Sequence, residues 1–143
     1  MGNSKQPQET PLKETILLVD DDESVRRGLF WTLEQSYRVL EASSRTEALR
    51  LLQRENIDVV VSDLHLPPHV DDISDGLAII EAARAREPAV PVLVITGTNS
   101  KSAGREAVKL GACGFFEKPL DKEEILHIVK QRDISPKCSE RSE

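Results

Sequence analysis

The segment that most constrains the fold is Ile16–Glu23, in which four apolar residues are followed directly by four acidic ones. A short apolar run bounded by charge is typical of a strand that is buried on both faces of a parallel sheet. The acids would then lie at the carboxyl end of that strand, where open α/β sheets bind ligands. Crowded carboxylates repel each other and favour a hard cation such as Mg²⁺ between them. The alternative is that Asp21, Asp22 and Glu23 only begin a helix, since acidic residues favour the first turn.

Length and charge exclude several classes of protein. The 143 residues suffice for one domain, and the net charge of −6 argues against nucleic-acid binding by this segment, which would need clustered Lys and Arg. No apolar run has the length of a membrane span, and the polar N-terminus does not resemble a signal peptide. Cys113 and Cys138 lack metal-ligand spacing and are too few for a disulfide framework, so we expect a cytoplasmic protein.

Apolar periodicity predicts strands and helices in alternation. After the first strand, Val25, Leu29 and Leu33 predict a helix over 23–34, and Ser44 with Glu47 forms a capping-box pattern for the next helix. A third helix is expected from Asp75 to near Pro88, a fourth, with Ala103, Ala107 and Leu110 inward, between Ser100 and Gly111, and a fifth after Asp121. The other strands are expected at 37–41, 58–63, 91–96 and 114–117.

Five strands and five helices in strict alternation predict a parallel sheet with right-handed helical crossovers on both faces. We expect one domain over 14–132, preceded by a disordered leader at 1–13 and followed by a disordered tail or the start of a linker at 133–143. Gly104 weakens the fourth helix by about 1 kcal/mol relative to alanine, which fits a mobile element.

Polar residues stand at the ends of four of the five expected strands, the first, third, fourth and fifth. They are Asp20 and Asp21, Asp63, Thr96 and Lys118, and the topology brings them to one edge of the sheet. Three carboxylates, a hydroxyl and an ammonium at one place suit a carboxylate that attacks a phosphoryl group and becomes an aspartyl-phosphate. A metal and a lysine would neutralise charge on the phosphoryl oxygens.

These motifs resemble the receiver domain of two-component response regulators over about residues 15–132. The matching segments are Val19–Asp22, Asp63–Pro67, Asp75-Gly76, Thr96-Gly97 and Gly114–Pro119. The resemblance implies a flavodoxin-like (βα)5 fold with strand order 2-1-3-4-5, the order of chemotaxis receivers.

The resemblance also implies a phosphoacceptor and its metal site. Asp63 would accept a phosphoryl group from a histidine kinase or a phosphotransfer protein. Asp20 and Asp21 would bind Mg²⁺ together with Asp63 and the backbone carbonyl of His65. The chain would be a switch that catalyses its own phosphorylation and dephosphorylation, and not an enzyme acting on other substrates.

Three further residues match the family's switch. Thr96 would be the hydroxyl that closes on the phosphoryl group, Lys118 would pair with phosphoryl oxygens, and Phe115 takes the place of the aromatic that turns inward. The Lys118–Pro119 bond matches one that the family often holds cis. Each also has an ordinary reading: Asp63 as a helix cap, Thr96 as a strand residue, Lys118 as a surface cation and Phe115 as a core aromatic. It is the combination that favours the functional roles.

The sequence departs from the family in one loop. Seven residues, Pro68–Ser74, separate Pro67 from Asp75, where the family usually has two. Surface insertions are tolerated, so a harmless flap is favoured. The sharper hypothesis is that the insertion shapes kinase choice or phosphate lifetime, and shortening it to two residues would test this. A zinc site from His65 and His69 is disfavoured because nothing fixes their geometry.

The resemblance predicts a phosphorylation switch whose output face comprises the fourth helix, the fifth strand and the fifth helix. Its partner would be a downstream effector, an effector domain of the same protein that controls transcription, or a second copy of the chain. A protein-interaction module that is never phosphorylated is the alternative, and a flavin carrier ranks below both. The sequence leaves open whether the receiver stands alone or is part of a larger regulator.

Overall fold

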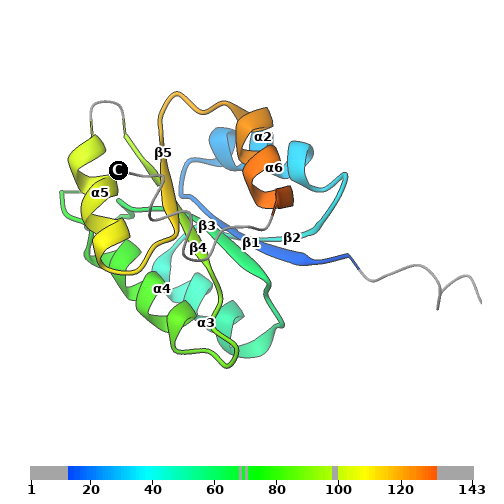
Figure 1. The fold of residues 1–143 in the computed structure, drawn as a ribbon, viewed down its shortest axis with the longest axis horizontal. Helices are drawn as coiled ribbons and strands as arrows, with labels where there is room; N and C mark the ends of the chain where they lie inside the picture. The colour runs from blue at the N-terminus through cyan, green and yellow to red at the C-terminus, as the bar shows by residue number, and fades with distance from the viewer. Residues whose placement is uncertain (1–12, 68, 70, 98–99, 132–143) are drawn as a thin grey trace, which may run out of the picture.

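The computed structural model describes residues 13–67, 69, 71–97 and 100–131. Its centre is a parallel five-stranded sheet with the order β2-β1-β3-β4-β5 (Figure 1). The strands are β1 (Thr15–Val19), β2 (Arg38–Ala42), β3 (Val59–Asp63), β4 (Val92–Thr96) and β5 (Gly114–Glu117). The predicted fold and strand order are confirmed. Except for Lys13, the predicted leader and tail lie outside the described residues.

Five helices alternate with the strands and cover both faces of the sheet. They are α2 (Glu23–Leu33), α3 (Arg45–Arg54), α4 (Ser74–Arg84), α5 (Lys101–Lys109) and α6 (Lys122–Gln131). Helices α2 and α6 lie on one face, and α3, α4 and α5 lie on the other (Figure 1). No helix among the described residues is long and apolar enough to cross a bilayer.

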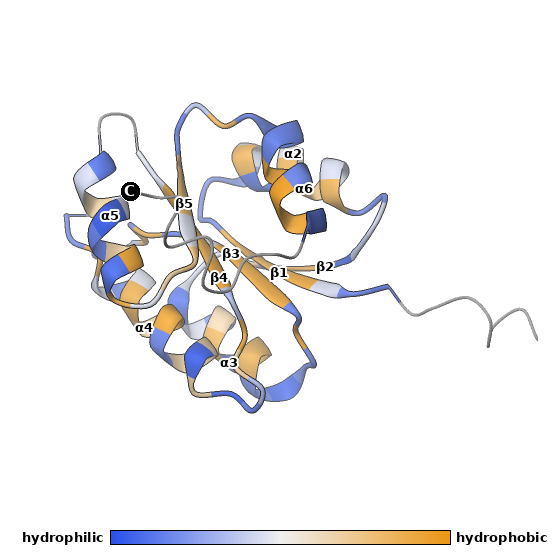
Figure 2. Cartoon of the chain, viewed as in Figure 1, coloured by the Kyte–Doolittle hydropathy of each residue, from blue (hydrophilic) through white to orange (hydrophobic). Residues whose placement is uncertain are grey.

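The central strands consist mainly of apolar residues, which Figure 2 shows in orange. Ile16 and Leu18 of β1 pack toward α2 and α6, whereas Leu17 and Val19 pack toward the opposite face. All four side chains are fully buried. Because a strand's side chains alternate between faces, an uninterrupted apolar run is what a sheet covered on both sides requires. The double cover fixes the carboxyl ends of the strands relative to one another.

Side-chain caps set the starts of two helices as the sequence indicates. The Ser44 hydroxyl accepts a hydrogen bond from the Glu47 amide at 3.2 Å, and the Glu47 carboxylate accepts one from the amide of Ser43 at 2.9 Å. The capping box is therefore present, with its return bond shifted by one residue. Asp121 accepts from the amide of Glu124 at 3.1 Å and begins α6 as predicted.

Two helix-end predictions are wrong. Helix α4 ends at Arg84 and not near Pro88, because the Val90 amide already returns to the carbonyl of Ala83 at 2.9 Å. Leu110, predicted to face inward, is 46% exposed. Helix α5 stops at Lys109, and Gly111 follows with φ of 127°, so Leu110 leaves the helical periodicity and turns to the surface.

Gly104 has a packing role that its sequence context does not reveal. A Cβ built on Gly104 would overlap the Phe115 ring, lying 2.5 Å from Cγ and 2.9 Å from Cε2. Helix α5 therefore needs a glycine where the ring of Phe115 crosses it. The glycine that weakens the helix is what lets β5 and α5 approach each other.

We expect Gly104→Ala to lower the free energy of unfolding by about 1–2 kcal/mol, since overpacking outweighs the gain of about 1 kcal/mol in helix propensity. Gly28→Ala is the matched control, because a Cβ on that helical glycine meets only the flexible end of Lys122, with Nζ at 3.2 Å. It should leave stability unchanged or raise it. Urea denaturation measures both. A Gly104→Ala variant as stable as Gly28→Ala would contradict the packing role.

Candidate functional site

Asp20 is the first residue after β1, and it is fully buried. Its Oδ1 accepts a hydrogen bond from the Asp22 amide at 2.9 Å, whereas Oδ2 has no hydrogen-bond partner among the described residues. Burial foremost, and then the charges of Asp63 and Asp21, raise the pKa of Asp20 to about 6 against the opposing effects of the Asp22 amide and Lys118. A buried acceptor without a partner costs about 1–3 kcal/mol. Oδ2 is thus an atom that a bound cation would satisfy.

Asp63 ends β3 on the neighbouring strand, with a side chain only 7% exposed. Its Oδ1 accepts from the His65 amide at 3.1 Å, and its Oδ2 lies 3.4 Å from Lys118 Nζ. Burial raises the pKa of Asp63, and the bonds to His65 and Lys118 limit that rise. The carboxylate is therefore held by one fixed donor on each oxygen.

Lys118 follows β5 and extends toward Asp63, with its side chain 28% exposed. Burial lowers the pKa of Lys118, but the carboxylates of Asp63 and Asp20 outweigh it and leave the pKa above its usual value. The ammonium therefore stays charged. The Lys118–Pro119 peptide bond is cis, as predicted.

Thr96 lies at this edge, whereas Phe115 is the second residue of β5 and lies toward the opposite end of that strand. Thr96 ends β4 and is fully buried, and its hydroxyl donates to the carbonyl of Phe116 at 3.4 Å. Phe115 in β5 is half-buried and packs against the core under α5. Thr96 therefore lies at the strand end where the sequence predicts it, and Phe115 lies within the predicted strand at 114–117.

Asp20, Asp21 and Asp63 form the cluster that could hold a metal ion. One carboxylate oxygen from each lies within 4.8 Å of the others. The donor set is all oxygen, which suits Mg²⁺, and Asp20 brings to it a carboxylate whose Oδ2 is buried without a partner among the described residues. The residues present therefore fit a hard divalent cation. The amide of His65 donates a hydrogen bond to Asp63. That the carbonyl of His65 is a metal ligand stays a prediction.

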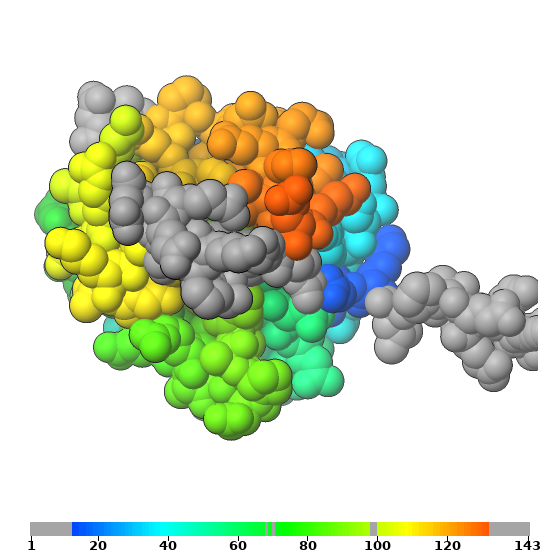
Figure 3. All heavy atoms as spheres, viewed as in Figure 1, coloured from blue at the N-terminus to red at the C-terminus, as the bar shows by residue number. Residues whose placement is uncertain are grey.

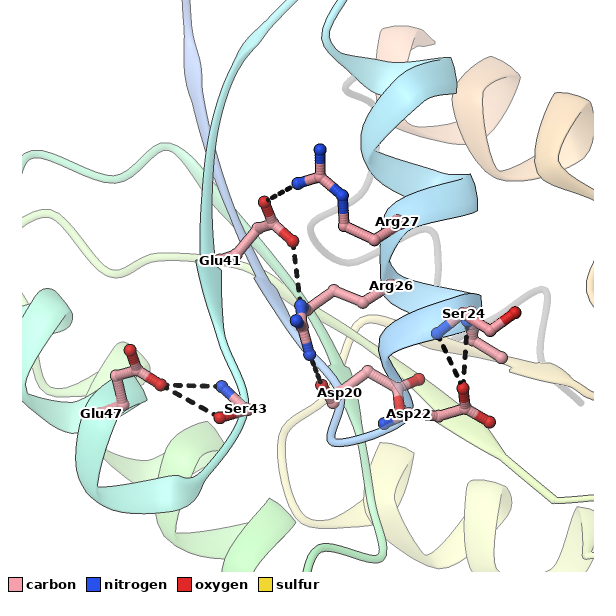
Figure 4. Close-up of polar contacts among 9 residues, drawn as sticks. Asp20, Asp22, Ser24, Arg26, Arg27, Glu41, Ser43 and Glu47 are labelled. Atoms are coloured by element: carbon pink, nitrogen blue, oxygen red, sulfur yellow. Dashed lines mark hydrogen bonds and ion pairs between the residues drawn. The ribbon is translucent and has the colours of Figure 1, made fainter.

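The acids that follow β1 differ in their roles: one of them caps a helix, and two belong to the carboxylate cluster. Asp22 caps α2, because its Oδ1 accepts from the amides of Ser24 at 3.0 Å and Val25 at 3.2 Å (Figure 4). Asp20 and Asp21 join Asp63 in the cluster instead. The helix-start interpretation is confirmed for Asp22, whereas a metal-binding role for Asp20 and Asp21 stays a prediction.

The described part of the Pro68–Ser74 insertion is tied to the body of the domain. His69 Nδ1 lies 3.2 Å from Oδ2 of the buried Asp75, which also accepts from Arg45 Nη1 at 3.2 Å. Among the described residues, the one cluster arranged for a metal contains no histidine, so the geometry gives the disfavoured zinc alternative no support.

The sequence pattern did not indicate that Arg26 and Glu41 lie beside the acidic edge. Arg26 donates to the carbonyl of Asp20 and to the carboxylate of Glu41, so it reaches the acidic edge from α2. A weak sequence signal existed: an arginine near the start of a helix opposes the helix dipole, which suggests another reason for its presence.

A family model, the response regulator receiver domain, matches residues 16–130. The chain belongs to the response regulator receiver family. The fold, the strand order and the placement of the acidic edge all agree with this membership.

Two curated relatives and one solved structure illustrate the likeness. Transcriptional regulatory protein GlrR of Escherichia coli K12 is 34% identical over 116 residues, which are 80% of this chain and 25% of that protein. Photosynthetic apparatus regulatory protein RegA of Cereibacter sphaeroides is 34% identical over 125 residues, 85% of this chain and 65% of that protein. Chemotaxis response regulator CheY4 of Vibrio cholerae is 28% identical with a TM-score of 0.70, covering 83% of this chain and 98% of that one. The chain spans about a quarter of the length of the first curated relatives it matches.

Proposed function

We propose that this receiver is a phosphorylation switch in which Asp63 accepts the phosphoryl group. The donor would be the phosphohistidine of a sensor kinase or of a phosphotransfer protein. A carboxylate oxygen of Asp63 forms a bond to phosphorus while the phosphorus–nitrogen bond to the histidine breaks, and the electron pair leaves with the imidazole. The observation that carries the proposal is the position of Asp63 between Lys118 at 3.4 Å and the carboxylates of Asp20 and Asp21.

Asp20, Asp21, Asp63 and the carbonyl of His65 would hold Mg²⁺. When bound, the ion neutralises negative charge on the phosphoryl oxygens and on the carboxylates around them. Asp20 supports this role because its Oδ2 is buried and has no partner among the described residues. Lys118 would donate to a second phosphoryl oxygen from the opposite side.

Thr96 and Phe115 would convert the new charge into a change of shape. Phosphorylation adds roughly −2 charges and strong acceptor oxygens. The Thr96 hydroxyl, which now donates weakly to a backbone carbonyl at 3.4 Å, would turn to the phosphoryl group. Phe115, packed over Gly104, would move with it and alter the surface of α5.

The output surface would comprise α5, β5 and α6. Figure 3 shows α5 in yellow and α6 in orange on the same side of the molecule. The partner would be a downstream effector, an effector domain of the same protein or a second copy of this chain. GlrR is named a transcriptional regulatory protein, which supports control of transcription as the output. We propose that the switch acts in the cytoplasm, and that the receiver itself does not contact nucleic acid, since the chain has a net charge of −6.

Acetyl phosphate tests the proposal directly. Incubation of the full chain with acetyl phosphate and Mg²⁺ should give a single adduct with the mass of one phosphoryl group, and excess EDTA should prevent it. Intact mass spectrometry and peptide mapping identify the adduct. A folded chain that takes no adduct would favour the alternative, a receiver that acts as an interaction module without phosphorylation.

His65→Ala is expected to shorten the lifetime of the phosphorylated state. His65 follows Asp63 by two positions and donates its amide to that carboxylate at 3.1 Å. Its side chain would obstruct the water that hydrolyses the acyl phosphate. Decay of the adduct after removal of acetyl phosphate measures the half-life, and equal half-lives in the two proteins would refute the role.

A further inference from the structure

Arg26 connects three parts of the chain at the acidic edge (Figure 4). From α2, its Nη1 donates to the carbonyl oxygen of Asp20 at 2.8 Å, and its Nε donates to Oε1 of Glu41 in β2 at 2.9 Å. The Arg26 side chain is only 15% exposed. A long cationic side chain with both ends of its guanidinium bonded is held in a single orientation.

The carbonyl that Arg26 binds belongs to the peptide that joins Asp20 to Asp21. The other polar groups of Asp20 are also fixed: its amide donates to the carbonyl of Ala42 at 3.1 Å, and its Oδ1 accepts from the amide of Asp22 at 2.9 Å. Among the described residues, Oδ2 is the one polar atom of Asp20 left without a partner. Arg26 therefore fixes the plane of the peptide from which both clustered carboxylates branch.

Glu41 provides the carboxylate with which the guanidinium of Arg26 pairs. Its two oxygens bind two arginines, Oε1 to Arg26 and Oε2 to Arg27 at 2.5 Å. Without that partner, the guanidinium could turn to the carboxylates of Asp20 and Asp21, because arginine pairs readily with carboxylates. It would then compete with a cation for the same oxygens.

We propose that Arg26, anchored by Glu41, is a positioning residue for the cation held by Asp20 and Asp21. It acts by fixing the peptide between those two residues, and it does not itself contact the metal or the phosphoryl group. The inference rests on the metal site of the proposed function and adds to it a pair of residues that set its geometry.

Loss of the pair should weaken Mg²⁺ binding, since residues that orient metal ligands typically contribute about 10-fold or more in affinity. We expect Arg26→Ala to raise the dissociation constant for Mg²⁺ by about 10-fold. At saturating Mg²⁺ the yield of the phosphoryl adduct should return to that of the wild type, because Asp63 and Lys118 are untouched. A purely structural role would not separate these two readouts.

Arg27→Ala is the matched control. It removes the same charge and a bond to the same glutamate, but among the described residues the Arg27 guanidinium bonds to Glu41 and not to Asp20. Calorimetric titration of the full chain with MgCl₂ should give Arg27→Ala an affinity close to that of the wild type. Glu41→Gln is a second, isosteric variant that should weaken Mg²⁺ binding through Arg26, and the double variant Arg26→Ala/Glu41→Gln should lose little more, since coupled residues are not additive.

Two outcomes would overturn the inference alone. One is a wild-type affinity for Mg²⁺ in both the Arg26→Ala and Glu41→Gln variants, and the other is an equal loss in Arg26→Ala and Arg27→Ala. A wild-type chain that binds no Mg²⁺ would overturn the proposed metal site and this inference with it. The titration of the wild type therefore separates failure of the function from failure of the positioning role.

Discussion

Asp63→Asn is expected to abolish the phosphoryl adduct completely. The amide is isosteric with the carboxylate, and its oxygen can still accept from the His65 amide, but it carries no negative charge with which to attack phosphorus. It also loses the ion pair with Lys118. Intact mass spectrometry after incubation with acetyl phosphate and Mg²⁺ gives the result.

Asp22→Asn is the control for this substitution. Asp22 lies in the same run of acids, yet it serves as the cap of α2, a position where asparagine is as good as aspartate. Its adduct should form to the same extent as in the wild type. A phosphoryl adduct of wild-type yield on Asp63→Asn would show that another side chain is the acceptor.

Asp20→Asn is expected to stabilise the metal-free protein at pH 7.5 by about 1–3 kcal/mol, although it weakens Mg²⁺ binding. The wild type holds a fully buried carboxylate whose pKa is raised to about 6, first by burial and then by the charges of Asp63 and Asp21. Asparagine keeps an acceptor for the Asp22 amide and removes the buried charge. Urea denaturation in the presence of EDTA measures the difference.

The pH dependence of this difference follows from the direction of the shift. A carboxyl with a raised folded pKa contributes stability below its unfolded value near 3.8, and that contribution is lost as the pH rises through about 6. The advantage of Asp20→Asn should therefore be small near pH 4, grow between pH 4 and 6, and level off above. Asp63 titrates in both proteins, so its contribution largely cancels.

Mg²⁺ should stabilise the wild type more than it stabilises Asp20→Asn. A ligand that binds only the folded state raises stability with concentration, so millimolar Mg²⁺ should stabilise the wild type and change Asp20→Asn little. If Asp20→Asn were instead less stable than the wild type in the absence of metal, the buried charge of Asp20 would not destabilise the folded protein as its burial implies.

The acidic edge was predictable because it follows from topology and not from packing detail. The apolar run of β1 leads directly into Asp20, the mostly apolar β3 ends in Asp63, and parallel strands present their carboxyl ends at one edge. Lys118 and Thr96 reach the same edge by the same rule. The order of the strands came from the family resemblance, since alternation alone allows several orders.

Other features depend on how the layers meet. The sequence could not distinguish Asp22, which caps α2, from Asp20 and Asp21, because all lie in one run of acids. Leu110 matches the helical period, yet it is exposed, since α5 ends one residue earlier. Gly104 looks like a helix breaker until the ring of Phe115 is placed over it.

The sequence by itself determined the class of fold, the succession of elements and the acids, hydroxyl and lysine that share one edge, because periodicity and strand polarity are local properties. Only the tertiary structure decided which oxygen is buried without a partner and which arginine holds the peptide beneath it. The bond from Arg26 to Asp20 spans six positions and the one to Glu41 spans fifteen. Such bonds arise where α2 closes over β1 and β2, and no local pattern encodes that closure.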